Sequence, residues 1–355
     1  MENTVSSWRT VFPFTALVDQ ERLKLALLLN AVNPRIGGVL IRGAKGTGKS
    51  TSVRALADLL PEVEVVEDCP FGCNPRDPTN MCDSCRSRKE KGEHLPVILR
   101  KMRVVDLPIG ATEDRVVGTL DIEKAIREGV KALEPGILAE ANQNVLYVDE
   151  INLLPDHIAD IILDAAASGW SVVEREGISV RHPSRFILVG TMNPEEGELR
   201  PQLLDRMALH TEVFTVLDPS LRVEVVKANI EFEDDPQGFV QKFMPAQEEL
   251  MSKIAKAKEL LQKTKIPDRL FETVAGMCIS LQMDGHRPDI VIMKSARTLA
   301  AFNGREEVQP KDILDCSFLT LSHRTRNMGV EPPASDRQIE EEFKKSLELS
   351  EKPSN

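Results

Sequence analysis

Eight residues near the start of the chain have the spacing of a phosphate-binding loop. Residues 43–50 read Gly-Ala-Lys-Gly-Thr-Gly-Lys-Ser, with an apolar run before them and an alanine- and leucine-rich segment after them. Glycines let several backbone N–H groups of such a loop point at phosphate oxygens, and the following helix directs its positive dipole end at the same anion. Lys49 is then placed to reach the β and γ phosphates, and Ser50 to bind Mg²⁺. The alternative is a chance match, but the flanking segments fit the strand and helix that the motif requires.

These features predict a nucleoside triphosphate site. The residues predicted to contact the nucleotide are Gly43, Ala44, Lys45, Gly46, Thr47, Gly48, Lys49, Ser50 and Thr51.

Two carboxylates follow a second apolar run about 100 residues further on. Asp149 and Glu150 come directly after residues 144–148, which read as a buried strand. At the carboxyl end of a parallel strand, Asp149 would hold Mg²⁺ and Glu150 would act as the general base on the attacking water. The alternative is that the pair caps a helix N-terminus. Together with the loop, the pair predicts ATP hydrolysis.

The elements that must position these residues alternate along the first 216 residues. Apolar runs at 39–41, 144–148 and 186–189 predict strands, and helical spacing is present at 14–32, 53–60 and 151–168. A loop is expected at 106–110, a helix at 121–133 and a hairpin at 170–182. This alternation favours an α/β fold with a parallel sheet.

The strand signals end near residue 217. The segments 247–261, 268–281, 288–302 and 311–324 have helical spacing, and residues 331–355 are polar with two prolines and a charged helix-like stretch. We therefore expect a nucleotide-binding domain at 1–216, a smaller helical domain at 217–330 and a polar tail at 331–355.

Four of the six cysteines lie within an irregular segment at 62–92, which we interpret as an insertion. They are spaced Cys69-x3-Cys73-x8-Cys82-x2-Cys85, and two close pairs on a short loop can converge on a structural Zn²⁺ or an iron–sulfur cluster. Plain reduced thiols are the alternative. The remaining Cys278 and Cys316 lie among apolar neighbours and are expected in the core.

The charge of the chain argues against nucleic acid as a partner. The 355 residues include 45 basic and 56 acidic side chains, a net charge of −11, which repels a phosphate backbone. His323, Arg324 and Arg326 form a small basic cluster, interpreted as a solvated helix end or a partner-facing patch. No run approaches the roughly 18 apolar residues of a membrane helix, and the first residues do not resemble a signal peptide. We expect a cytoplasmic protein.

Three further segments resemble one family. The stretches at 105–134 (VDLPIGATEDRVVGTLDIEKAIREGVKALE), 168–182 (SGWSVVEREGISVRH) and 193–206 (NPEEGELRPQLLDR) are similar to those of magnesium chelatase I subunits, which are AAA+ ATPases. The resemblance runs over nearly the whole chain. It implies an AAA+ P-loop core with a helical lid domain, a helical insert within 104–138 and a hairpin before the third strand.

The resemblance also implies roles for single residues. Asn193 matches the sensor that positions water, and Arg206 matches the arginine finger presented to ATP on a neighbouring subunit. Arg287 matches the second sensor, in the helical domain, and residues 14–20 match the segment that borders the adenine. The alternatives are a turn asparagine at 193 and a surface ion pair at 206.

The function that the resemblance implies is that of an ATPase motor subunit. Hydrolysis would drive insertion of Mg²⁺ into protoporphyrin IX on a separate large subunit, relayed by a second AAA+ subunit of the D type. A shared arginine finger implies a homo-oligomeric ring, expected to be a hexamer. The alternatives are a cobalt chelatase motor or another chelatase-like ATPase, and a remodelling ATPase of the MoxR or helicase type.

Overall fold

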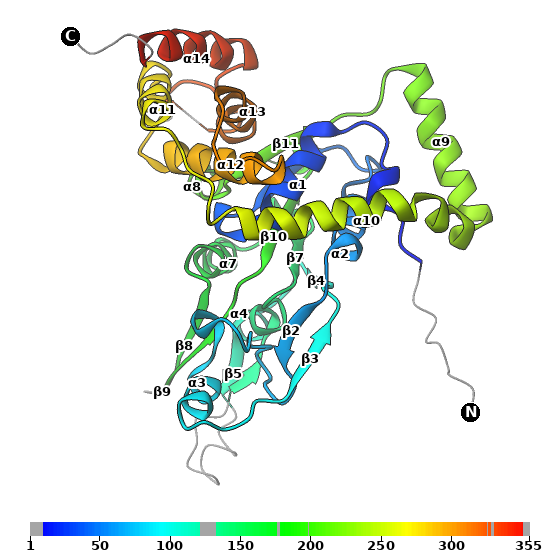
Figure 1. Ribbon diagram of the computed structural model, residues 1–355, viewed down its shortest axis with the longest axis vertical. Helices are drawn as coiled ribbons and strands as arrows, with labels where there is room; N and C mark the ends of the chain where they lie inside the picture. Colours follow the sequence, from blue (N-terminus) through cyan, green and yellow to red (C-terminus); the bar gives the residue numbers. More distant parts are fainter. Residues whose placement is uncertain are drawn as a thin grey trace.

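The computed structural model describes residues 10–120, 133–175, 178–197, 199–324, 326–327 and 330–350. The expected helix at 121–133 lies outside these residues except for Leu133, which begins strand β6. An α/β domain forms the lower part of the molecule in Figure 1, and a helical domain lies above it. The long helix α10 (Pro236–Leu260) runs across the α/β domain between helix α9 and the remaining helices of the helical domain.

Five parallel strands form the sheet of the α/β domain. Their order is β11-β1-β10-β7-β4, and β1 pairs with β10 on one side and with β11 on the other. Because all five run in the same direction, the residues that follow them meet at one edge. The strands are β1 (Val39–Gly43), β4 (Val104–Leu107), β7 (Val145–Val148), β10 (Ile187–Met192) and β11 (Leu209–Val213).

Helices cover both faces of the sheet, because successive side chains of a buried strand point to opposite sides. Val39 and Ile41 of β1 belong to one apolar cluster, with residues of α1 and α2, and Leu40 belongs to a second, with residues of α6 and α7. The helices and short turns of this domain are η1 (Phe14–Ala16), α1 (Glu21–Val32), η2 (Pro34–Ile36), α2 (Lys49–Leu59), α4 (Glu113–Val117), α6 (Ile137–Glu140), η4 (Ile151–Leu153), α7 (Asp156–Ser168), η5 (Pro194–Glu196) and α8 (Pro201–Arg206).

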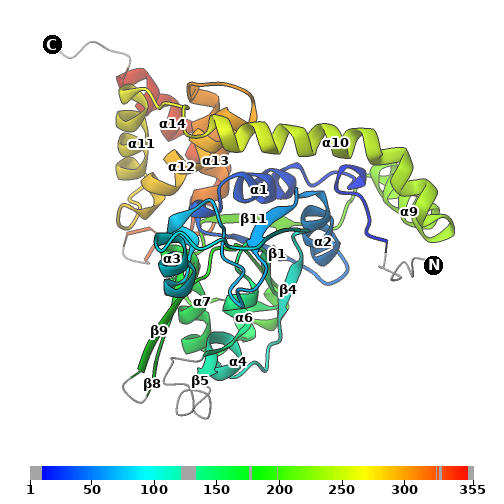
Figure 2. The same ribbon diagram turned by 60° about the horizontal axis from the view of Figure 1, so that its bottom comes forward.

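Among the described residues, three antiparallel strand pairs lie outside this sheet. Strands β2 (Val63–Val66) and β3 (Val97–Arg100) enclose the cysteine-containing insertion, with η3 (Pro78–Asn80) and α3 (Asp83–Glu90) between them. Strands β5 (Gly118–Leu120) and β6 (Leu133–Pro135) form the second pair. The third, β8 (Trp170–Arg175) with β9 (Ile178–Pro183), occupies the segment where a hairpin was expected. Figure 2 shows this hairpin below α3.

From Pro219 onward every regular helix or strand in the described part of the chain is a helix, which supports our proposed division near residue 216. The elements are α9 (Pro219–Asp234), α10, α11 (Asp268–Ser280), α12 (Arg287–Phe302), α13 (Pro310–Leu321) and α14 (Asp336–Ser350). Helix α14 lies where a charged helix-like stretch was expected within the polar tail at 331–355, but it packs on the helical domain. Its Ile339 and Phe343 lie on one face and are buried against the helical domain, while the charged residues face solvent.

Other elements also differ from expectation. Strand β4 includes Asp106 and Leu107, which were predicted as loop, because it pairs with the buried β7. Helix α10 begins at Pro236 and not near residue 247. It continues through Pro245, which normally marks a helix end. Strand β11 and helix α9 were not predicted at all.

Candidate functional site

A cleft of about 670 Å³ lies at the carboxyl edge of the sheet. The phosphate-binding loop, the residues after β7 and β10, and the segment before α1 all line it. The predicted adenine-bordering segment contributes Ala16, Leu17, Val18 and Gln20, and the Gln20 amide donates a hydrogen bond to the Thr47 carbonyl at 3.2 Å. The cleft therefore combines an apolar end with a polar end, as a nucleotide requires.

Backbone conformation explains two glycines of the loop. Gly48 is the N-cap residue of α2 and has φ +80°. Residues other than glycine adopt this left-handed conformation only with strain. Gly43 ends β1, where a Cβ would lie 2.5 Å from the Val213 carbonyl oxygen of β11. The loop thus passes close to the sheet edge, and its N–H groups and the start of α2 form a cradle that fits a phosphate chain.

Lys49 lies over this cradle. Its Nζ donates to the carbonyl oxygens of Gly43 at 2.6 Å and Ala44 at 2.7 Å. Burial lowers the pKa of Lys49, and the carboxylates of Asp149 and Glu150 oppose that shift. The ammonium group is therefore held by weak neutral partners, which triphosphate oxygens can replace. Ser50, on the first turn of α2, also lines the cleft.

Asp149 and Glu150 leave β7 in different environments. Asp149 Oδ1 accepts hydrogen bonds from the Thr191 hydroxyl at 2.6 Å and from the Tyr147 hydroxyl at 2.9 Å. The Glu150 N–H donates to the same Thr191 oxygen at 3.1 Å. Glu150 has φ +54°, a strained conformation of the kind found at functional sites. Thr191, at the end of β10, thus positions both acidic residues.

Lys45 of the loop reaches toward the carboxylate of Glu150. Its Nζ lies 3.5 Å from Glu150 Oε1 and 2.6 Å from Glu196 Oε1. These acidic neighbours, Glu196 above all, raise the pKa of Lys45. Glu150 therefore has a cationic partner within the same chain.

Asn193 lies in the cleft with a buried side chain. Its Oδ1 accepts a hydrogen bond from the Glu195 N–H at 3.3 Å and caps the short turn η5. The turn interpretation is thus realised in the structure. The position of Asn193 in the cleft is compatible with the sensor role, which stays a prediction.

Arg206 and Arg287 are not among the residues that line the cleft. The Arg206 guanidinium lies 3.0 Å from Asp160 and 2.9 Å from Asp164, both on α7. Arg287, at the start of α12, lies 3.3 Å from Asp205. Neither arginine reaches the phosphate loop of its own chain in this conformation.

The basic cluster at 323–326 is not a solvated helix end. His323 and Arg324 are each 3% exposed, because this segment packs between the helical domain and the segment that joins α8 to β11. The Arg324 Nη1 donates to the Asp205 carbonyl oxygen at 2.8 Å and also contacts the Asp205 carboxylate. Burial lowers the pKa of Arg324, and Asp205 opposes the shift. The interpretation as a partner-facing patch is also wrong.

Some residues of the site were not predicted. Thr191 was a recognisable candidate, because it is a polar residue at the end of an apolar strand beside the acidic pair. Arg222 and Asn229 of α9 also line the cleft, but their helix was not predicted. The four clustered cysteines lie together and away from the cleft, and Cys278 and Cys316 are buried as expected.

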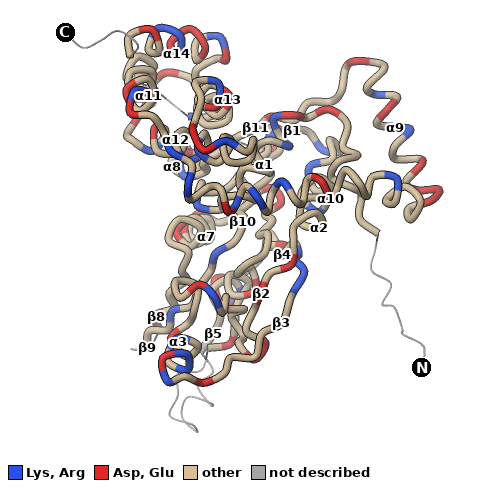
Figure 3. The backbone as a smooth tube through the Cα atoms, in the orientation of Figure 1, with Lys and Arg blue, Asp and Glu red and all other residues tan. Residues whose placement is uncertain are grey.

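Acidic and basic residues are interspersed over both domains (Figure 3). In the described part of the chain, no helix is both long enough and apolar enough to cross a membrane.

Two family models match the chain. One, described as magnesium chelatase, subunit ChlI, matches residues 122–215, and an AAA lid domain model matches residues 271–345. A magnesium-chelatase subunit ChlI homolog of Methanocaldococcus jannaschii is 58% identical, over 92% of this chain and 89% of its own. The magnesium-chelatase subunit ChlI of Nostoc sp. is 53% identical, over 96% of this chain and 91% of its own.

Solved structures agree with these matches. A complex between subunits BchI and BchD of magnesium chelatase, based on a cryo-EM reconstruction, contains a chain 46% identical to this one. The match covers 94% of this chain and 100% of that chain, with a TM-score of 0.54. A crystal structure from Cytophaga hutchinsonii is 16% identical with a TM-score of 0.57 and shows the fold alone. The cradle and acidic pair fit the ATP and Mg²⁺ that AAA+ ATPases bind, and the chain belongs to the magnesium-chelatase ChlI family of AAA+ ATPases.

Proposed function

We propose that this chain is the ATPase motor subunit of a magnesium chelatase and that ATP is hydrolysed between neighbouring copies in a ring. The conformational change would then drive insertion of Mg²⁺ into protoporphyrin IX on a separate large subunit. The observation that carries the proposal is the separation of the hydrolytic groups. The cradle, Asp149, Glu150 and Asn193 share one cleft, whereas Arg206 lies outside it, on the α7 side of the domain.

Each group has a defined part in this proposal. Lys49 and the loop N–H groups bind the triphosphate, and Ser50 and Asp149 hold Mg²⁺, which neutralises phosphate charge when bound. Glu150 accepts a proton from the attacking water, and Asn193 orients that water.

Two arginines act from outside the cleft. Arg206 of the neighbouring copy stabilises the charge on the transferring phosphoryl group. A homohexameric ring provides such a neighbour for every site. Arg287 responds to the nucleotide from the helical domain. Its contact with Asp205 places it next to α8, the helix that ends at Arg206.

The porphyrin is proposed to bind elsewhere in the complex. A second cavity, beside Asp205 and Arg324, holds about 70 Å³, whereas ligand pockets typically hold about 300–1,000 Å³. The relative in a complex with BchD supports a D-type AAA+ subunit as the direct partner. We propose a cytoplasmic location and no nucleic-acid partner.

A chelation assay tests the function. The purified chain is combined with candidate D-type and large subunits, ATP and protoporphyrin IX, with either Mg²⁺ or Co²⁺ as the metal donor, and metalloporphyrin is measured by fluorescence and absorbance. We expect Mg-protoporphyrin to form only with all three proteins and ATP, and the Glu150→Gln variant to abolish it. Insertion of Co²⁺ alone would overturn the magnesium assignment and favour the cobalt chelatase alternative.

A further inference from the structure

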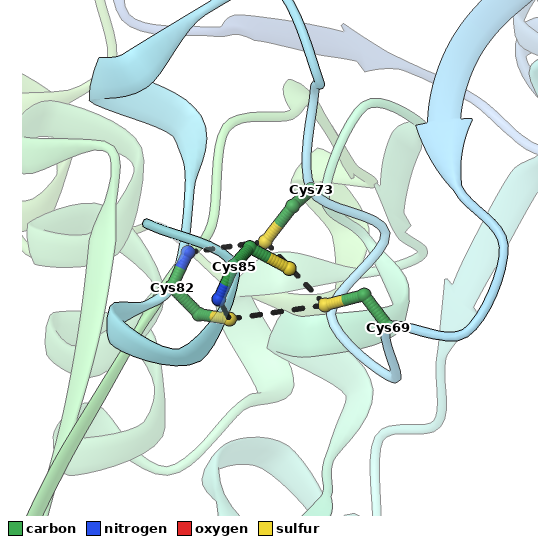
Figure 4. A group of neighbouring side chains, drawn as sticks. All are labelled: Cys69, Cys73, Cys82 and Cys85. Atoms are coloured by element: carbon green, nitrogen blue, oxygen red, sulfur yellow. Dashed lines mark hydrogen bonds between the residues drawn. The ribbon is translucent and has the colours of Figure 1, made fainter. Parts of the chain in front are cut away.

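The sulfur atoms of four cysteines converge inside the insertion between β2 and β3. Cys69 and Cys73 lie on the loop after β2, and Cys82 and Cys85 lie at the N-cap and in the first turn of α3. All four Sγ atoms lie within 4.8 Å of one another, with Cys69 Sγ 3.5 Å from that of Cys73 and 3.8 Å from that of Cys82. Figure 4 shows the four side chains directed toward one another.

These distances match one tetrahedral ion. Four thiolates at about 2.3 Å from Zn²⁺ lie about 3.8 Å apart. A disulfide requires about 2.05 Å between its sulfurs. A cluster of several irons needs room between the thiolates for the irons and their sulfides. A single ion therefore fits the sulfur spacing better than either alternative.

The backbone supports thiolate ligands. The Cys82 N–H donates to Cys73 Sγ at 3.1 Å, and the Cys85 N–H donates to Cys82 Sγ at 3.5 Å. Such bonds orient the ligands and offset part of their negative charge. Cys73, Cys82 and Cys85 are at most 4% exposed, so the ion would be shielded from solvent.

The apolar core of the insertion is small. Apart from its cysteines, its apolar cluster consists of the buried Val66 and Met81, with the partly buried Phe71 and Leu95. So small a core rarely stabilises a segment without a metal or disulfides.

The insertion nevertheless makes specific contacts with the α/β domain. The buried Asn142, just before β7, donates to the carbonyl oxygens of Phe71 at 2.9 Å and Gly72 at 3.0 Å. The Phe71 ring stacks on His182 of β9 with centroids 4.9 Å apart. Arg185, just before β10, forms an ion pair with Asp77 at 2.7 Å. The insertion therefore holds the starts of the two strands that carry the acidic pair and Thr191.

We propose that Cys69, Cys73, Cys82 and Cys85 bind one structural Zn²⁺, which keeps residues 67–96 folded and docked on the segments before β7 and β10. Binding exchanges thiol protons for the ion and requires no oxidant. The site is separate from the nucleotide cleft and does not depend on the proposed chelatase function.

Metal analysis of the full-length protein tests the site. The chain is expressed with both zinc and iron in the medium, purified under reducing conditions without a metal-affinity tag, and analysed by inductively coupled plasma mass spectrometry. We expect one zinc per chain in the unaltered protein. The control variant Cys278→Ala, which changes a buried cysteine of the helical domain, should also keep one zinc per chain. The Cys73→Ser/Cys82→Ser variant should lose zinc at least about tenfold. Neither metal, iron in place of zinc, or two disulfides in the intact mass would overturn the proposal.

A second measurement uses the unaltered protein and does not require the variant to fold. Zinc is displaced with a mercurial reagent and trapped by a chelating dye, and the mercurial is then removed with excess thiol. Hydrogen exchange of this zinc-free protein is compared with that of the untreated, zinc-loaded protein. Exchange should rise in residues 67–96 and around residues 182–185 but not in α11–α13. Unchanged exchange in the insertion would overturn the structural role of the ion.

Discussion

Arg324 of the helical domain donates a hydrogen bond to the main-chain oxygen of Asp205, the residue directly before the proposed arginine finger, and contacts its carboxylate. The same guanidinium donates to the Met207 carbonyl oxygen at 3.2 Å, on the other side of the finger residue. The backbone on both sides of Arg206 is thus held by one buried side chain. Movement of the helical domain would therefore move the finger.

Replacing Arg324 should weaken hydrolysis without weakening nucleotide binding. Arg324→Met removes the donor to the Asp205 main-chain oxygen and one of the two donors to that of Met207, which keeps its bond from His323 Nε2 at 3.0 Å. The loss should lower the free energy of unfolding by about 2–3 kcal/mol. Displacement of Arg206 by a fraction of an ångström should reduce kcat about 10–100-fold. Urea unfolding and steady-state ATPase assays measure the two effects.

Arg305→Met is the matched control. Arg305 forms a bidentate pair with the buried Asp312 of the helical domain at 2.7 and 2.6 Å, and neither residue contacts the finger segment. This variant should lose comparable stability and keep its kcat. Equal loss of kcat in both variants would contradict a specific link between Arg324 and the finger.

Thr191 is expected to position the acidic pair. Thr191→Val keeps the shape of the side chain but removes the donor to Asp149 and the acceptor for the Glu150 N–H. Loss of a hydrogen bond to a charged group costs about 1.5–3 kcal/mol. We therefore expect about a tenfold or larger fall in kcat and a higher Mg²⁺ requirement, measured by titrating Mg²⁺ in the ATPase assay. Thr191→Ser should restore most of the activity, and if it does not, packing and not hydrogen bonding explains the effect.

The junction between the domains should weaken at acid pH. His210 of β11 packs against His323, with ring centroids 5.2 Å apart and the ring planes tilted by 37°. Burial lowers the pKa of His210 to about 4, with a further contribution from Arg42, and burial also lowers the pKa of His323. A lowered histidine pKa means that the folded state favours the neutral ring. This contribution to stability is therefore present above the unfolded value near 6.5 and is lost as the pH falls from 6.5 to about 4.

For His210 alone, lowering the pH from 7 to 5 should reduce the free energy of unfolding by about 2 kcal/mol. His210→Gln can still hydrogen-bond but cannot be protonated, so its unfolding free energy should fall less over this range. His157→Gln, at an exposed position, serves as the control and should follow the unaltered protein. Parallel pH profiles for all three proteins in urea unfolding would refute this account.

The sequence predicted the parts of the site in which local pattern determines structure. The phosphate loop and the acidic pair are contiguous motifs next to apolar strands, so their place at one sheet edge followed from the parallel topology. Helix α10 was predicted only from residue 247, because a proline such as Pro245 normally marks a helix end. The helix in fact begins at Pro236, where the Asp235 side chain caps it by accepting a hydrogen bond from the Gly238 N–H. The polar composition of α14 concealed Ile339 and Phe343, whose burial depends on the helices they pack against.

Contacts between distant segments were not predictable. The basic residues at 323–326 were interpreted from their charge. Nothing in the local sequence shows that Arg324 is paired with Asp205, 119 positions earlier. The four cysteines were recognised from their spacing, but that spacing did not show that the sulfurs converge. The structure supplies both relationships because each depends on tertiary packing.

Shared hydrolysis between copies is the central claim, and mixing two inactive variants tests it most directly. Glu150→Gln should bind ATP but hydrolyse it about 10²–10⁴-fold more slowly, and Arg206→Ala should be slower about 10³-fold or more. In an equimolar mixed ring, an Arg206→Ala site receives an intact finger from a Glu150→Gln neighbour at about a quarter of all interfaces.

ATPase activity should therefore return in the mixture to about a quarter of that of the unaltered ring, if the sites act independently. A mixture of Glu150→Gln with Lys49→Ala is the control, because both changes affect the cradle side and no interface becomes complete. Mixed-ring formation is verified by native mass spectrometry. Restored activity in the first mixture and none in the second is the predicted result. Mixed rings that form and stay inactive in the first mixture would contradict a site shared between copies.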